Sequence, residues 1–427
     1  MHGHGSSDHA LTLRLNATPR VALVTALLIA ALATAWGVAQ LWPGPHQSTS
    51  SANGGYAVAG VSFPQATVLT VQPPCPQPAL NPSGSSDGTP FTPSAPIAAC
   101  GKVAARMVSG PDRGKVVQVD VPREVTLSGV THGDRLQLMR TPPAPQIGPS
   151  YSFAAVERTT TLWIMAAAFV LVLLLVARVR GLLALAGLAF AGMVLIRFMI
   201  PSLLAGHSGI AVALVGSAAI MFVILYLAHG PTMRTSVALA GTLVGICIIT
   251  AVSQGAVHAA RLTGVVDETG GTMGALVGNV SLQGLLTCGV IVAGLGVLND
   301  VTITQASAVW ELRAAAPDMP RRQLFSSAMR IGRDHIASTV YTIVFVYVGT
   351  ALSVLMLITL YSRPVLDLLN TEDIAEEVVR TLAGAIGLMM AVPATTAIGI
   401  LVVSSATLGR GRSAHSLTDD PVLVSVS

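Results

Sequence analysis

Long apolar runs constrain this chain more than any other feature of its sequence. The first covers 21–41, and seven more lie between residues 162 and 403. A helix of about 20 apolar residues, rising about 1.5 Å per residue, crosses a hydrocarbon core about 30 Å thick. Only 10% of the 427 residues are charged, against about 25% in a typical soluble protein. The sequence therefore excludes a soluble enzyme and predicts an integral membrane protein in contact with the lipid bilayer.

Arginine sets the orientation of the spans, because Lys and Arg are retained on the cytoplasmic side. The seven later spans are predicted at 162–177, 181–203, 209–228, 237–258, 281–304, 336–360 and 379–403. With the N-terminus inside, 12 arginines fall in cytoplasmic segments, and the short outer loops carry only Arg261 and Arg363. This predicts a multi-pass protein of a bacterial plasma membrane with both termini cytoplasmic.

Composition divides the chain into five segments. These are a cytoplasmic His-containing tail (1–20), a first transmembrane helix (21–42), an extracytoplasmic β domain (43–161), a seven-helix membrane domain (162–403) and a cytoplasmic tail (404–427). His2, His4 and His9 could bind a metal, but histidines on an unpatterned polar tail are more often only solvated, and we predict no metal site. The last outer loop is acidic, with Asp367, Glu372, Asp373, Glu376 and Glu377.

The first apolar run has two interpretations. Arg14 and Arg20 precede it, and Ala33-Thr34-Ala35 resembles a signal-peptidase site. The run nevertheless continues to an interfacial Trp42, which is typical of a retained anchor. We favour the anchor, and an N-terminus at Trp36 in purified protein would indicate cleavage instead.

Between 43 and 161 the sequence pattern changes to short strands. Val117, Val119 and Val121 alternate with Gln118 and Asp120, which is the period of a half-buried strand. Further strands are predicted at 66–71 and 135–139. The fold prediction is an all-α polytopic bundle of about eight transmembrane helices. A small extracytoplasmic β-barrel-like domain, with an OB-like fold as one candidate, is inserted between the first and second helices.

Two of the four cysteines lie in this exported segment. Export to an oxidising compartment would allow Cys75 and Cys100 to form a disulfide that closes a Pro-rich loop. Cys247 and Cys288 lie within apolar runs instead. A free-thiol count on non-reduced protein tests the pairing.

Motifs of soluble catalysis are absent from the sequence. It contains no His-Glu-x-x-His, Gly-x-Ser-x-Gly or Cys-x-x-Cys. The nearest approach to a phosphate loop, 110–116, has the wrong glycine spacing and lacks the Ser or Thr that would contact Mg²⁺. We therefore predict that the protein is not an enzyme and needs no cofactor.

A polar stripe marks the sixth predicted span. Asp300, Thr304, Ser307 and Glu311 fall within about 60° of one another on a helix. An acid in hydrocarbon costs several kcal/mol unless it is paired, protonated or hydrated, so Asp300 is the main candidate for an ion or proton path. Asn299 could orient it. The alternative is that the helix leaves the bilayer near Asp300 and the stripe meets cytoplasmic water.

Three other residues are lesser candidates. Arg197 lies in an apolar run and is expected to reach the outer headgroups. His229 and His258 could relay protons, although their interfacial positions favour an ordinary solvated role. Small residues such as Gly241 and Gly245 predict close helix packing. A break in the helix at 294–296, facing a substrate, is a sharper alternative.

These motifs resemble the YibE/F family of multispanning bacterial membrane proteins. The resemblance rests on GLGVLNDV at 294–301, ASAVWEL at 306–312, MRIGRDH at 329–335, HGPTMRTS at 229–236, GTLVG at 241–245 and LTG at 262–264. It covers 150–403 and implies a membrane protein often described as transporter-like, without naming a substrate. Where the family usually has Asn-Thr-Leu, this chain has Val340-Tyr341-Thr342-Ile343, so a role for that Asn is not carried over.

Two functions are consistent with these features. The first is a transporter or transport subunit in which Asp300, with Glu311, binds a proton or cation while the outer domain engages a small solute or a partner. The alternative is a non-transporting assembly or scaffold protein whose outer domain binds an envelope component. A homo-oligomer or a membrane partner fits either function, and nucleic acid fits neither.

Overall fold

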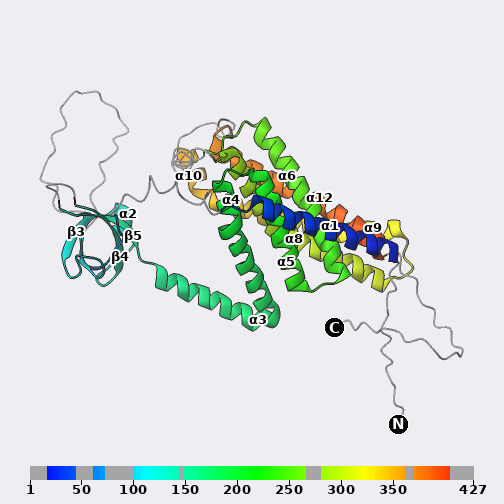
Figure 1. The fold of residues 1–427 in the computed structure, drawn as a ribbon, viewed down its shortest axis with the longest axis horizontal. Coiled ribbons are helices and arrows are strands. Elements are labelled where there is room, and N and C mark those ends of the chain that lie inside the picture. Colours follow the sequence, from blue (N-terminus) through cyan, green and yellow to red (C-terminus); the bar gives the residue numbers. More distant parts are fainter. Residues whose placement is uncertain are drawn as a thin grey trace, which may run out of the picture. The chain divides into compact units, whose positions relative to one another are not determined.

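The computed structural model describes residues 17–44, 61–72, 101–143, 148–265, 280–360, 367 and 369–403 (Figure 1). The chain forms two compact units, one of Met1–Ser48 with Val179–Ser427 and the other of Thr49–Arg178. The disulfide candidates Cys75 and Cys100, and His2, His4 and His9 of the N-terminal tail, lie outside the described residues. Those predictions therefore stay untested.

The Thr49–Arg178 unit contains a five-stranded antiparallel sheet. Its strands are β1 (Gln65–Val71), β2 (Lys102–Met107), β3 (Val116–Asp120), β4 (Arg135–Thr141) and β5 (Ser150–Val156), and the short helix α2 (Arg123–Leu127) follows β3. The order is β3-β2-β1-β4-β5, and the two end strands β3 and β5 also contact each other. The sheet is therefore nearly closed, as the β-barrel-like prediction required.

Alternating side chains build the core of this sheet. Val119 and Val121 are buried and Val117 is half-buried, whereas Gln118 and Asp120 are exposed. The three predicted strands are confirmed as β1, β3 and β4. Strands β2 and β5 were not predicted. The buried residues of β2, Val103, Ala105 and Met107, are interleaved with Lys102, Ala104 and Arg106, which weakens the apolar alternation, and β5 has only half-buried and exposed residues.

The other unit consists of long helices, and the chain passes into it within α3. Their bounds are α1 (Ala17–Leu41), α3 (Thr159–Val194), the π-helical turn η2 (Leu195–Met199), α4 (Ile200–Leu204), α5 (Gly209–His229), α6 (Met233–Ala259), α8 (Leu282–Ala315), α9 (Arg321–Thr350), α10 (Leu352–Leu360) and α12 (Glu372–Val403). Arg178, with φ 51° and ψ −129°, interrupts α3 at the boundary between the units.

Six helices in the described part of the chain are long and apolar enough to cross a membrane. They are Thr18–Leu41, Thr159–Leu204, Gly209–His229, Met233–Ala259, Leu282–Ala315 and Glu372–Val403. The second contains two predicted spans, 162–177 and 181–203, on either side of Arg178. The predicted span 336–360 is divided at Ala351 between α9 and α10. Eight crossings therefore stay a prediction, while a multi-pass arrangement is supported.

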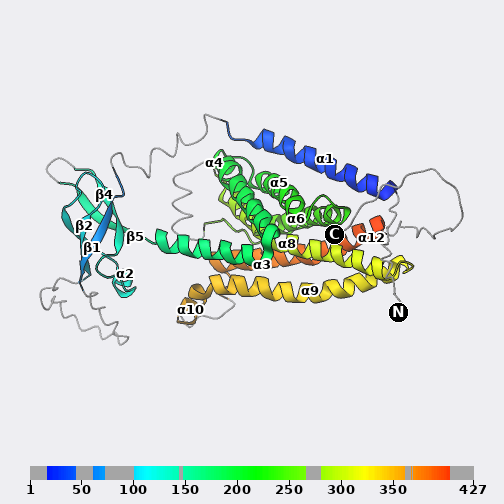
Figure 2. The same ribbon diagram turned by 90° about the horizontal axis from the view of Figure 1, so that it is seen from below.

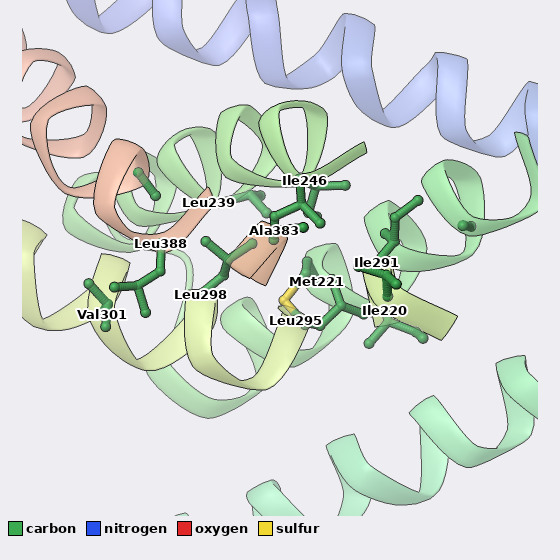
Figure 3. Close-up of a cluster of buried hydrophobic side chains, with 14 of the residues drawn as sticks. Ile220, Met221, Leu239, Ile246, Ile291, Leu295, Leu298, Val301, Ala383 and Leu388 are labelled. Carbon is green, nitrogen blue, oxygen red and sulfur yellow. The ribbon is translucent and has the colours of Figure 1, made fainter. Parts of the chain in front are cut away.

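Helices α6, α8 and α12 pack against one another at the centre of this unit. Figure 3 shows buried side chains of α5, α6, α8 and α12 meeting there, among them Leu239, Leu298 and Leu388. A Cβ added to Gly245 would lie 2.7 Å from Leu298, and one added to Gly241 would lie 1.9 Å from Thr395. The close packing predicted for these two glycines is confirmed.

Helix α8 is continuous from Leu282 to Ala315, so the predicted alternative of a break at 294–296 is wrong. The physical reason is packing: a Cβ at Gly294 would lie 2.6 Å from the side chain of Ile249. Gly294 therefore provides room for a neighbouring side chain rather than a helix end.

Helix α1 lies alongside α5 (Figure 2). A Cβ at Gly37 would meet the side chain of Val215 at 2.5 Å. At the end of α1 the Ser202 hydroxyl donates to the Leu41 carbonyl at 2.8 Å, and the ring of Trp42 stacks on Phe198 with centroids 6.0 Å apart. The first apolar run is thus packed into the helical unit.

Candidate functional site

The predicted polar stripe lies on one continuous face of α8. Asp300 and Glu311 are exposed, and Thr304 and Ser307 are half-buried. The Thr304 hydroxyl donates to the Asp300 carbonyl, and the Ser307 hydroxyl to the Ile303 carbonyl, both at 2.8 Å. Both hydroxyls thus donate their hydrogen bonds to backbone carbonyls of their own helix. The groups of the stripe that remain available to bind a proton or a cation are its two carboxylates. Neither carboxylate forms an ion pair with a described residue.

Asn299 has a different environment from Asp300. It lines a cavity with Arg180, His229 and Arg234, and its buried Oδ1 has no hydrogen-bond partner among the described residues. No hydrogen bond between described atoms joins it to the Asp300 side chain. The orienting role predicted for Asn299 therefore gains no support from the geometry.

A cavity of about 780 Å³ opens between α9, α10 and α12. We call it the α9–α12 cavity. Its lining is mostly apolar but includes Tyr347 of α9 and Asp373, Glu377 and Arg380 of α12. Two acids and one base make it slightly acidic.

A smaller cavity of about 150 Å³, the α8–α9 cavity, adjoins the first one. Both are lined by Val346 and Tyr347, and the smaller one reaches Ala293 and Val297 of α8. At about 100° per residue, Ala293 and Val297 share a face with Asp300. The face of α8 that closes the α8–α9 cavity is therefore the face that carries Asp300, which lies about one turn beyond Val297 and is not itself in the lining.

The acidic outer loop predicted before the last span is partly a helix. α12 begins at Glu372, so the acids at 372–377 occupy its first turns. Carboxylates stabilise a helix N-terminus because the backbone N–H groups there are unpaired and the dipole is positive. The loop prediction is wrong for these residues, because their acidity was interpreted as solvation rather than as a helix start.

Two of these acids have specific environments. Glu372 accepts hydrogen bonds from Thr263 N at 2.5 Å, Thr263 Oγ1 at 2.6 Å and Gly264 N at 2.9 Å. Glu376 is only 5% exposed, and its Oε1 has no partner among the described residues. Arg380 lies 4.0 Å from Glu376 and 2.7 Å from Glu377. Sequence reasoning missed this cluster, although the spacing of acids and Arg380 at three and four residues was a usable signal.

Single polar residues also meet inside the bundle. The hydroxyls of Thr242 and Thr302 are 2.7 Å apart, joining α6 to α8. Gln305 donates to Thr396 Oγ1 at 2.7 Å and to the Ala328 carbonyl at 3.0 Å, joining α8 to α12 and α9. These contacts resemble the interhelical hydrogen bonds that hold membrane helices together. They were not predicted, because an isolated polar residue in an apolar run has no periodicity.

The lesser candidates lie at separate places. Arg197 is exposed in the π-helical turn η2, while His229 ends α5 and His258 lies in the last turn of α6. The structure does not bring them to Asp300. Across the described ranges, no group of three or more His, Cys, Asp or Glu side chains could hold a metal ion.

Long apolar helices around a core with interhelical hydrogen bonds define a multi-pass membrane protein. A family model described as YibE/F-like protein matches residues 165–405, which is more than half of the chain. The chain belongs to the YibE/F-like family. No curated protein and no solved structure matches it.

Proposed function

We propose that this protein is a transporter or transport subunit of a bacterial plasma membrane, not an enzyme. In this proposal Asp300 binds a proton or cation whose movement is coupled to that of a small solute. One observation carries it: two adjoining cavities extend from acidic residues at the start of α12 to the face of α8 that holds Asp300.

The residues that line these two cavities favour the entry of a cation over that of an anion. Asp373 and Glu377 would attract positive charge to the α9–α12 cavity, and Arg380 limits that attraction by pairing with Glu377. Beyond Tyr347 the α8–α9 cavity is almost wholly apolar. Since an ionised Asp300 within hydrocarbon costs several kcal/mol, protonation or cation binding there would be tied to the state of the surrounding helices.

The sheet unit supplies the second part of the proposal. Its order β3-β2-β1-β4-β5, its near closure and the helix α2 between β3 and β4 support an OB-like fold. The positive-inside distribution would place this unit outside the cytoplasm and both termini inside. There it would bind the solute or a membrane partner, and a second copy of the chain could complete the transport path.

The test compares the metal and metabolite contents of cells that carry wild type, a deletion of the gene, Asp300→Asn, or Asp318→Asn. Asp318 is an exposed acid in the connection between α8 and α9, and it serves as the matched control. We expect Asp300→Asn to reproduce the deletion profile at wild-type membrane levels, and Asp318→Asn to reproduce wild type. A wild-type profile for Asp300→Asn would exclude Asp300 as the coupling residue.

A scaffold function is the second candidate, favoured by the separate core of the sheet unit. Under it, removal of 61–156 would abolish function while Asp300→Asn would have no effect. The same set of cells, extended by this deletion variant, separates the two functions.

A further inference from the structure

A cavity of about 500 Å³, distinct from the two described above, lies between α3, α5, α6 and α8. We call it the basic cavity. Arg180 enters it from α3, His229 from the end of α5, Arg234 from the first turn of α6 and Asn299 from α8. Four elements therefore each contribute one polar side chain to the same space.

Among the described residues, no acid balances the positive charge of the basic cavity. No acidic residue is among its described lining, and neither Arg180 nor Arg234 forms an ion pair with a described residue. Arg234 also stands at the N-terminus of α6, where the helix dipole is positive. Such a site attracts an anion, and arginine prefers the oxygens of carboxylate or phosphate.

The rest of the cavity is apolar. Ala184 and Leu188 follow Arg180 at one-turn intervals along α3, and Ile224 and Ala228 precede His229 on α5. Charge therefore gathers at one end of the space and aliphatic walls extend away from it. A free inorganic anion would use only the charged end, whereas a lipid would use both.

We propose that the basic cavity binds an anionic phospholipid. The phosphate lies between Arg180 and Arg234, and the start of an acyl chain runs along Ala184 and Leu188. Asn299 completes the polar part of the lining from the side of α8. The arginines lie on the side that the charge distribution predicts to be cytoplasmic, where basic pockets between helices bind acidic headgroups. This inference is independent of transport through Asp300.

Native mass spectrometry of the purified full-length protein in detergent tests the proposal. Phosphatidylglycerol, phosphatidylcholine and inorganic phosphate are titrated separately. We expect saturable binding of phosphatidylglycerol and a loss of affinity of about 30-fold in the Arg180→Gln/Arg234→Gln variant. The matched control is Arg321→Gln/Arg330→Gln, which removes two exposed arginines of α9 and should leave affinity unchanged.

A second variant tests the same proposal if the double variant fails to fold. Ala184→Trp keeps both arginines, occupies the apolar half of the cavity and changes an exposed residue. We expect about tenfold weaker phosphatidylglycerol binding, as for losing contact with roughly two methylene groups. Equal binding of phosphatidylcholine, binding of inorganic phosphate alone, or unchanged affinity in a folded variant would each overturn the proposal.

Discussion

The two units of this chain distribute polar and apolar groups in opposite ways. In the sheet unit, Val103, Leu136 and Leu138 are completely buried, and the charged residues lie outside that core. In the helical unit, Leu32 and Phe345 are each 71% exposed, whereas Gln305 is 1% exposed. The same chain therefore contains one unit with an apolar interior and one with an apolar exterior.

This difference reflects the two solvents. In water, burial of apolar area provides the stabilisation, so the sheet closes around its branched residues. In lipid the exterior gains nothing from burial, and helices are held by close packing and interhelical hydrogen bonds. The comparison predicts that glycines and buried polar groups matter most in the helical unit, and that titratable surface groups matter in the sheet unit.

The largest loss of stability is expected from a substitution at Gly209, where the backbones of two helices are in contact. A Cβ at Gly209 would lie 2.1 Å from the Gly284 carbonyl oxygen, and a backbone atom cannot move aside as a side chain can. Gly209→Ala should therefore lower the free energy of unfolding by about 3 kcal/mol or more. Thermal unfolding in detergent measures it.

Gly296→Ala is the matched control for that substitution. Gly296 also lies in a helix, but a Cβ there would meet nothing within 4 Å. We expect a neutral change or a gain of up to about 1 kcal/mol, because alanine favours helix over glycine. Equal destabilisation by both substitutions would mean that close packing does not hold the helical unit.

An intermediate effect is expected from the buried amide of Gln305. Gln305→Ala removes its hydrogen bonds to Thr396 and to the Ala328 carbonyl, and we expect a loss of about 1–2 kcal/mol. Unfolding in detergent again provides the measurement. Gln254→Ala changes an exposed glutamine of α6 and should have little effect. A larger effect at Gln254 would contradict the importance given to buried polar contacts.

The smallest effect belongs to the sheet unit. Hydrogen bonds from Lys115 and Tyr151, and then one from Arg140, lower the pKa of Asp112 from 3.8 to about 2. The unfolded chain therefore binds the proton more readily, so the stabilisation is complete above about pH 4 and is lost as the pH falls toward 2. Asp112→Asn should remove this part of the acid sensitivity.

Pepsin digestion of the full chain between pH 5 and pH 2 measures that change. Cleavage within 101–156 should accelerate less steeply with falling pH in Asp112→Asn than in wild type. Asp120→Asn is the control, because Asp120 is exposed and lies 3.9 Å from its partner Lys102. An identical pH profile for wild type and Asp112→Asn would show that the cluster does not stabilise the sheet.

Sequence predicted those parts of the fold in which one periodicity dominates. The length of the apolar runs identified helices of the helical unit, and the alternation of apolar and polar residues identified β1, β3 and β4. The division of α9 from α10 at Ala351 was not predicted, because an apolar run gives no sign of where a helix within it ends. The start of α12 at Glu372 was missed because acids suit both a helix N-terminus and a solvated loop.

The candidate site was predicted only along one helix. Helical spacing placed Asp300, Thr304 and Glu311 on one face of α8, and the structure keeps them there. The contacts of Gln305, Glu372 and the basic cavity join elements far apart in the chain, so no local pattern contains them. In the sequence, Arg180 and Arg234 indicate only the cytoplasmic side of the membrane. Their charge alone does not show that they line the same cavity.

The carboxylate of Glu372 has a mechanical consequence. Its three accepted hydrogen bonds fasten the chain after α6 to the first turn of α12, across 109 positions of sequence. Moving these two helix ends apart would require all three bonds to break together. While these bonds last, the end of α6 and the start of α12 therefore move together.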